Sequence, residues 1–142
     1  MCCVVILKRR KGGVIMIDLS TFKTFDFSEG FPYASITNHG ITFNKSVIMK
    51  LGYPTFVRLL IDDVNKQIAV QVCEENEDKS VSFYKENARS IYSVRWNARD
   101  LLSTIERFMD WDLETSSYRV NGVLIPEYSL MLFDLNKATL LA

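Results

Sequence analysis

The 142-residue sequence has few residues of the kinds that build metal centres and disulfide frameworks, with one histidine and three cysteines. Cys2, Cys3 and Cys73 are odd in number and lack Cys-x-x-Cys spacing, which indicates reduced thiols instead of disulfides. Adjacent strand residues point to opposite faces, so Cys2 and Cys3 are poorly placed to hold one ion with Cys73 and His39. We therefore predict no metal site and no cofactor.

Long apolar runs are also missing. No run approaches the roughly 20 residues that a helix needs to cross a bilayer, which argues against a membrane span. The first residues, MCCVVILKRRKGG, place their basic side chains after a short apolar run, the reverse of a secretory signal. We expect a cytoplasmic protein without a membrane partner.

The sequence has no charge excess of either sign, because 17 basic and 17 acidic side chains cancel. The balance is uneven along the chain. Residues 1–60 contain eight lysines or arginines and three acids, a net charge of +5, whereas residues 61–87 have a net charge of −4. The basic part could meet phosphate groups, but a solvated face with the acidic segments folded back onto it explains the same pattern.

Signatures of catalysis are absent. The phosphate-binding patterns Gly-x-Gly-x-x-Gly and Gly-x-x-x-x-Gly-Lys-Ser/Thr do not occur, nor does Gly-x-Ser-x-Gly. His39 sits in the turn-like Asn-His-Gly, and no nucleophile signature accompanies it. The carboxylate pairs Asp62-Asp63 and Asp110/Asp112 fit a loop and a helix end better than an acid and base pair. We predict that the protein is not an enzyme and has no small-molecule substrate.

With 48% hydrophobic and 24% charged residues, the chain is typical of a globular protein with one real core. The segments VVILKRR and VIMIDL flank Lys11-Gly12-Gly13, which predicts an N-terminal β-hairpin because glycine supplies the positive φ of a tight turn. Residues 20–40 mix aromatic residues with turn formers, and we expect short extended pieces there.

Two helix starts share one pattern, 53 positions apart. Asn44 precedes a helix that Gly52 and Pro54 end, and Asn97 precedes a second helix. Each start also has an apolar pair suited to a hydrophobic staple, Phe43 with Ile48 and Trp96 with Leu101. The second helix has an apolar face made of Leu101, Leu102, Ile105, Phe108 and Met109.

Two later segments also match, 71 positions apart: LLIDDVNKQIAV at residues 59–70 and LMLFDLNKATLL at residues 130–141. Each reads as a hairpin, with residues 57–61 facing 68–72 and residues 130–133 facing 139–141. The second unit is therefore longer by 18 residues. Asn121-Gly122 has the signature of a type I′ turn, which predicts an inserted hairpin over residues 118–125.

Tandem duplication and coincidence both explain these matches, and the shared order of cap, staple, helix and turn favours duplication. We predict an α+β, mostly β fold in which two pseudo-repeats of a strand–helix–hairpin unit form one compact swapped-hairpin-like barrel. Residues 1–40 add the N-terminal hairpin and an irregular segment, residues 41–73 form the first repeat, 74–80 an acidic loop, and 81–142 the second repeat. One intramolecular pseudo-dimer would result.

The first unit, ITF followed by NKSVIMKL and VRLLIDDVNKQIAVQV, resembles the AbrB/MazE-type swapped-hairpin module, and residues 94–141 do so less clearly. The resemblance implies a compact intertwined barrel that binds DNA in transcription regulation. Residues 41–137 also resemble uncharacterised proteins of Firmicute genomes and mobile elements, through Ile41-Thr42-Phe43-Asn44, the 57–73 hairpin, Tyr118-Arg119-Val120-Asn121-Gly122 and Leu132-Phe133-Asp134-Leu135. That resemblance implies no activity.

Two functions from different classes follow. The first is a DNA-binding regulatory protein, whose contacts to double-stranded DNA would come from a hairpin tip and from residues near the helix starts. The candidates are Arg9, Arg10, Lys45, Arg58, Arg95 and Arg99. Basic residues at a hairpin tip also keep an edge strand soluble, which is the simpler interpretation of Arg9 and Arg10. The second function is a protein-interaction or self-association module that uses the 118–125 hairpin.

Overall fold

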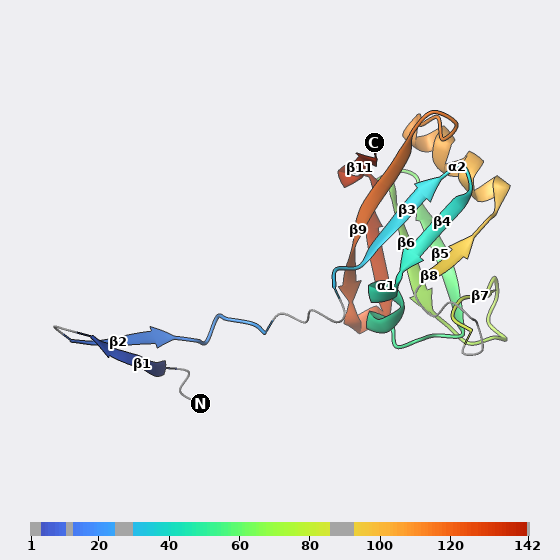
Figure 1. The fold of residues 1–142 in the computed structure, drawn as a ribbon. Helices are drawn as coiled ribbons and strands as arrows, with labels where there is room; N and C mark the ends of the chain where they lie inside the picture. The colour runs from blue at the N-terminus through green and yellow to red at the C-terminus, as the bar shows by residue number, and fades with distance from the viewer. Residues whose placement is uncertain (1–3, 11–12, 25–29, 86–92, 142) are drawn as a thin grey trace.

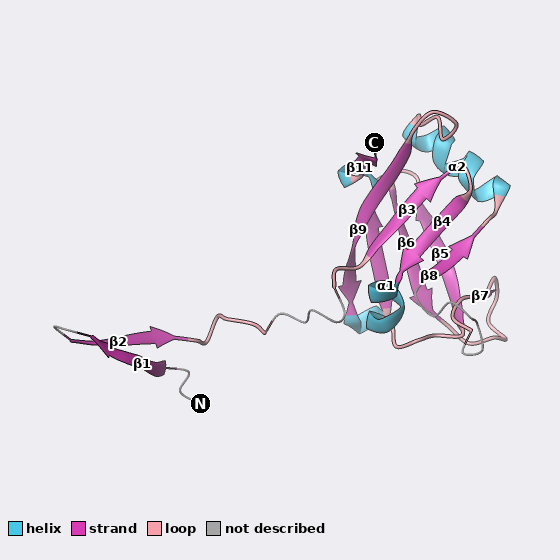
Figure 2. Cartoon of the chain, in the orientation of Figure 1, coloured by secondary structure: helices cyan, strands magenta, loops and turns pink. Residues whose placement is uncertain are grey.

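The computed structural model describes residues 4–10, 13–24, 30–85 and 93–141. These residues form a mostly β structure with few helices (Figures 1 and 2). The strands are β1 (Val4–Arg10), β2 (Gly13–Asp18), β3 (Tyr33–Thr37), β4 (Gly40–Asn44), β5 (Phe56–Asp62), β6 (Gln67–Val72), β7 (Val81–Ser82), β8 (Ser93–Trp96), β9 (Ser117–Ile125), β10 (Leu130–Asp134) and β11 (Thr139–Leu141). The helices are α1 (Lys45–Lys50) and α2 (Arg99–Met109), with 3-10 turns η1 (Pro126–Tyr128) and η2 (Leu135–Lys137).

The main sheet is antiparallel and has the strand order β7-β5-β6-β10-β9-β3-β4-β8, with β11 beside the first half of β9. It curls into a half-barrel, and α1 and α2 lie at opposite ends of it (Figure 1). The predicted α+β, mostly β class is confirmed. The predicted N-terminal hairpin is confirmed as well, since β1 and β2 pair in a sheet of their own. Lys11 and Gly12 of its turn lie outside the described residues.

The core fills the concave side of the curled sheet. Phe43 of β4 and Phe133 of β10 are fully buried, and their ring centroids lie 5.6 Å apart. Burial of a phenylalanine side chain contributes roughly 2 to 3 kcal/mol, so this pair is a large part of what holds the two sides of the half-barrel together. Within the described residues, no helix is long and apolar enough to cross a bilayer.

Helix α1 begins as the sequence predicts. The Asn44 side chain accepts a hydrogen bond from Val47 N at 3.3 Å, which satisfies one of the amides left free at a helix start. The same oxygen accepts from Tyr33 N at 3.0 Å, and Asn44 Nδ2 donates to Phe31 O at 2.8 Å. Asn44 therefore fixes the start of β3 as well as the start of α1. Gly52, with φ +83°, follows the helix end.

Helix α2 has the predicted apolar face, with Leu102 and Ile105 buried and Leu101, Phe108 and Met109 packed against the core. The predicted cap at Asn97 is wrong. Ala98 occupies the N-cap position, and no side chain caps the helix start. Because α2 is long and buries a whole face, packing supplies the stability that a cap supplies to the short α1.

The predicted type I′ turn at Asn121-Gly122 is wrong, because β9 runs straight through both residues. Asn121 pairs with Tyr33 of β3, and Gly122 pairs with Phe133 of β10. A Cβ atom at Gly122 would lie 2.8 Å from Sδ of Met131 and 2.9 Å from the ring of Phe133. The glycine therefore serves close packing within a strand instead of turning the chain.

The predicted C-terminal hairpin over residues 130–141 is also wrong. The strands β10 and β11 do not pair with each other, and η2 separates them. β10 pairs with β6 and with the second half of β9, while β11 pairs with the first half of β9. The strands β10 and β11 thus pair with successive parts of the same edge of β9. The sequence pattern of two apolar runs around a turn does not show this arrangement.

Candidate functional site

The half-barrel is open along one seam, between β5 and β8. On the side of β5 that faces away from β6, β7 pairs with Phe56 and Val57 only. Among the described residues, no strand pairs with the rest of that edge, nor with the edge of β8 that faces away from β4. Unpaired strand edges carry free backbone donors and acceptors, and can pair with another strand.

The hydrogen-bond pattern shows which residues point into the seam. Phe56 O accepts from Cys73 N on the β6 side at 3.2 Å, whereas Thr55 O accepts from Phe83 N on the opposite side at 2.8 Å. Backbone groups alternate between the two sides of an antiparallel strand. The N–H and C=O groups of Leu59 and Ile61 therefore point into the seam.

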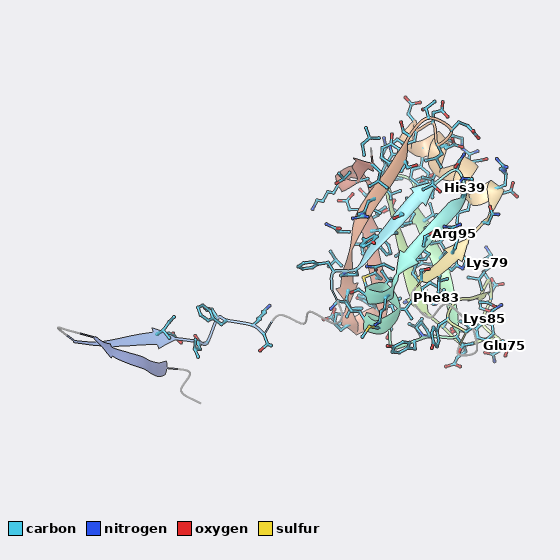
Figure 3. All side chains as sticks on the ribbon, in the orientation of Figure 1. His39, Glu75, Lys79, Phe83, Lys85 and Arg95 are labelled. Atoms are coloured by element: carbon cyan, nitrogen blue, oxygen red, sulfur yellow. The ribbon has the colours of Figure 1, made fainter. Side chains whose placement is uncertain are left out.

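Trp96 of β8 closes one end of the seam with its side chain. Its indole Nε1 donates to Ser82 O of β7 at 3.2 Å. The ring also packs against Phe43 and Phe83, with centroid distances of 5.1 Å and 5.8 Å. The two edges of the seam are thus joined here by a side chain. In a closed barrel, backbone hydrogen bonds between neighbouring strands would join them. Phe83, one of these packing partners, is labelled in Figure 3, as is Arg95, the residue before Trp96.

A cavity of about 340 Å³ lies in the seam. Its volume falls at the lower end of the range for ligand pockets. The lining is mainly apolar and comes from both edges and the start of α2: Leu59, Val81, Arg95, Trp96, Asn97, Ala98 and Leu101. The cavity is large enough for one or two apolar side chains, so the seam combines a free backbone edge with an apolar floor.

The rim of this cavity is basic. Arg95 is exposed, and its Nε donates to the hydroxyl of Thr42 at 3.1 Å, a neutral partner that leaves the positive charge unbalanced. Arg99 is exposed at the first position of α2, one residue after Ala98. Of the predicted nucleic-acid contacts, Arg95 lines the cavity, and Arg99 directly follows the lining residue Ala98 in the chain.

The other predicted contacts lie elsewhere. Lys45 follows Asn44, which is paired with Ser93, so it sits at the opposite end of the β4–β8 ladder from Arg99. Arg58 is half-buried on the convex side of the sheet, where its Nη2 donates to Gln71 Oε1 at 3.1 Å. Arg9 and Arg10 end β1 in the separate two-stranded sheet. The six residues are thus distributed over five elements, β1, α1, β5, β8 and α2.

The side chains considered for catalysis lie in turns. His39 is exposed, and Asp110 adopts a left-handed conformation, with φ +56°, at the end of α2. Asp62 organises the β5–β6 turn by accepting hydrogen bonds from Val64 N and Asn65 N. Within the described part of the chain, no three histidine, cysteine or carboxylate residues lie together as metal ligands would.

The seam was not predicted from the sequence. Its two edges are far apart in the chain, and β7 has only two residues. One feature of the sequence does point to it: Trp96 and Leu101 are the apolar staple pair of the second helix start, and both line the cavity. The chain matches no protein-family model, and searches of curated proteins and of solved structures found no match.

Proposed function

We propose that the chain is a protein-interaction module without catalytic activity, and that its seam takes an extended segment of another protein as an added strand. The observation that carries the proposal is the open edge at Leu59 and Ile61 beside an apolar cavity of about 340 Å³. Main-chain hydrogen bonds to such an edge give affinity, and pockets for alternate side chains give specificity.

The chemistry of the seam defines the partner segment. Alternate residues of an added strand point to one face, so one apolar side chain would enter the space between Leu59, Ala98 and Leu101. The exposed guanidinium groups of Arg95 and Arg99 favour a carboxylate in the same segment. We therefore expect an extended apolar segment that carries an acidic residue.

DNA binding through the six basic residues stays a prediction. The six residues come from five different elements, β1, α1, β5, β8 and α2, so no single helix or strand presents them together. Contacts to several phosphates increase the affinity together only when the basic side chains match the spacing of phosphates along the DNA. A protein partner needs only the local features of the seam.

We also propose that the fold arose by duplication of a strand–helix–hairpin unit. Thr42 and Arg95 lie directly opposite each other in the β4–β8 pair. In an antiparallel pair with this register, Phe43 and Trp96 each follow the Thr42–Arg95 pair by one residue and Asn44 and Asn97 by two, which agrees with the offset of 53 in the sequence. At the other matched pair of segments, Asn136 Nδ2 donates to Asn65 O at 2.9 Å. These relationships support duplication, whereas β10 and β11 pair with other strands and not with each other, which departs from a repeated hairpin.

Selection from a phage-displayed library of random 12-residue peptides against the full chain tests the proposal. The blocking variant is Ala98→Trp, which places a large ring over the cavity from an exposed position. Ser103→Trp is the matched control, because it adds the same ring at an exposed position of α2 that does not line the cavity. We expect enriched peptides to alternate in hydrophobicity, to contain an acidic residue, and to lose binding at least tenfold with Ala98→Trp only.

Alternate N-methylation of a selected peptide adds a test of the backbone contact. Blocking the N–H groups on one edge should abolish binding, whereas blocking those on the other edge should not, because an added strand uses one edge only. Peptides that bind both tryptophan variants equally, or that tolerate both methylation patterns, would exclude strand addition at the seam.

A further inference from the structure

The convex face of the sheet, away from the core, has an ordered pattern of rows that cross four strands. The register of β5, β6, β10 and β9 places Leu60, Ala69, Leu132 and Val123 side by side in one apolar row. The row on one side of it contains Arg58, Gln71, Leu130 and Ile125. The row on the other side contains Asp62, Gln67 and Asp134. We call these the apolar row, the arginine row and the acidic row.

The apolar row is open to solvent at its ends. Leu60 is 39% exposed and Val123 is 60% exposed. Between them Ala69 is small, and a hollow of about 190 Å³ lies around it with Leu60 and Leu132 in its wall. The face therefore has exposed apolar side chains, Leu60 and Val123, and a hollow with apolar residues in its wall.

Among the described residues, packing into the main core uses the other face of these strands, and Ala69 is the buried member of the apolar row. The buried core is formed by the opposite side of the same strands, through Val57, Ile68, Val70, Met131 and Phe133. Arg58 is half-buried on the convex face, yet the described structure gives it a neutral partner, Gln71, and leaves its Nε without a hydrogen bond. A half-buried guanidinium with no carboxylate partner is costly unless another molecule supplies one.

We propose that a second copy of this chain covers the convex face, in a symmetric dimer whose two-fold axis runs along the apolar row. In this arrangement strands of the two copies run in opposite senses, and each apolar row faces its equivalent. The arginine row of one copy then lies over the acidic row of the other. Arg58 of each copy faces Asp62 of its partner, which makes two equivalent ion pairs in one isologous interface.

The charges select this axis over the alternative. A two-fold axis parallel to the strands would place each arginine row over another arginine row, with Arg58 over Ile125 and Asp62 over Asn121 in the middle of β9. That arrangement leaves both charges facing neutral groups. Only the axis along the rows pairs opposite charges while keeping the apolar rows in contact.

The area of the three rows is small for a stable dimer interface. Four strands spaced about 4.8 Å apart and three rows about 6.8 Å apart span roughly 19 by 20 Å, or about 400 Å² in each copy. Stable interfaces commonly bury about 800 Å² in each partner. We therefore expect weak, concentration-dependent association and not a permanent dimer.

Sedimentation equilibrium of the full chain between 5 and 500 µM tests the proposal. Val123→Lys adds a charge to the apolar row at an exposed position and should raise the dissociation constant at least tenfold. Val64→Lys is the matched control, because Val64 is 83% exposed in the β5–β6 turn and lies outside the three rows; it should change the constant less than twofold. Circular dichroism confirms that each variant is folded.

A charge-exchange cycle tests the axis. Arg58→Glu and Asp62→Lys should each weaken the dimer, and the double variant should recover at least about fivefold relative to the product of the two single effects, since two pairs are restored. A protein that stays monomeric at 500 µM overturns the proposal. A dimer that Val123→Lys leaves intact overturns it too, and a dimer without recovery in the double variant excludes this axis.

Discussion

The position that a Cβ atom would take at Gly122 lies 2.8 Å from Sδ of Met131, closer than side-chain atoms approach in folded proteins. Gly122 faces the fully buried Phe133 across the β9–β10 pair, and the ring lies 2.9 Å from the same position. The side chains of Met131 and Phe133 therefore pack directly against the backbone of β9 at Gly122. This contact explains why a glycine occurs in the middle of a long strand.

Gly122→Ala should destabilise the protein by about 1 to 3 kcal/mol, because both neighbours belong to a packed core and cannot move away freely. In an open strand the same change would be favourable, since alanine restricts the unfolded chain. Urea denaturation followed by fluorescence measures the free energy of unfolding. Val123→Ala, at the neighbouring exposed position, is the control and should cost less than about 1 kcal/mol. A neutral Gly122→Ala would contradict the close approach.

Asn44→Ala should lower the free energy of unfolding by about 1 to 3 kcal/mol. The change removes the α1 cap and leaves the amides of Val47 and Tyr33 without their acceptor. Asn97→Ala tests the equivalent sequence position, where the structure has no side-chain cap, and should cost less than about 0.5 kcal/mol. Thermal denaturation of the two variants compares them directly. Equal losses would mean that Asn97 caps α2 after all.

The β5–β6 turn should make stability depend on pH in the acid range. Hydrogen bonds from the backbone and side chain of Asn65, and then from Gln67, hold the pKa of Asp62 below its usual value of 3.8. A lowered pKa means that Asp62 contributes stability above its unfolded pKa, and that this contribution disappears as the pH falls through the lower folded value. Asp62→Asn should therefore be less stable than the unaltered protein at pH 6, and the difference should shrink below about pH 4.

Asp63→Asn is the control for that measurement, because the turn hydrogen bonds go to Asp62. Denaturant unfolding at pH 6, 4 and 2.5 gives the comparison. If the difference between Asp62→Asn and the unaltered protein persisted unchanged at pH 2.5, an ionised Asp62 would not be the source of the effect.

The thiol of Cys73 should react slowly at neutral pH. Partial burial raises its pKa, and the negative charge of Glu77 raises it further, against a smaller lowering by Arg58. Since the thiolate is the nucleophile, alkylation by iodoacetamide at pH 7.5 should be slower than that of a short unstructured cysteine peptide. A Cys2→Ser/Cys3→Ser background isolates Cys73. Denaturation should bring the rate up to that of the peptide, and a native rate equal to the peptide rate would contradict the raised pKa.

Duplex DNA should bind weakly if at all. We expect no saturable binding of a 30-base-pair duplex by fluorescence anisotropy at about 50 mM salt, where phosphate contacts are strong. Arg95→Glu/Arg99→Glu is the informative variant, because Arg95 lines the seam cavity and Arg99 directly follows the lining residue Ala98. Tight binding that this variant abolishes would favour the DNA-binding hypothesis over strand addition.

Features that depend on short-range interactions were predictable. The start of α1 at Asn44 follows from one side chain and an amide three residues later, and the β5–β6 hairpin follows from two β-rich runs around an Asp-Asn turn. The apolar face of α2 follows from its spacing. Long-range pairing was less predictable. Asn121-Gly122 has the signature of a turn, yet Tyr33 and Phe133, 88 and 11 residues away, hold it in a strand.

The sequence by itself determined the mostly β class, both helices, two of the hairpins and the apolar face of α2, because these follow from propensities and periodicities over a few residues. The tertiary structure decided that β9 stays unbroken, that β10 joins β6, and that the sheet stops short of closing between β5 and β8. It also decided which faces of the sheet are covered. Strand order and closure depend on contacts between segments far apart in the chain, and burial alone fixes which of several compatible pairings is made.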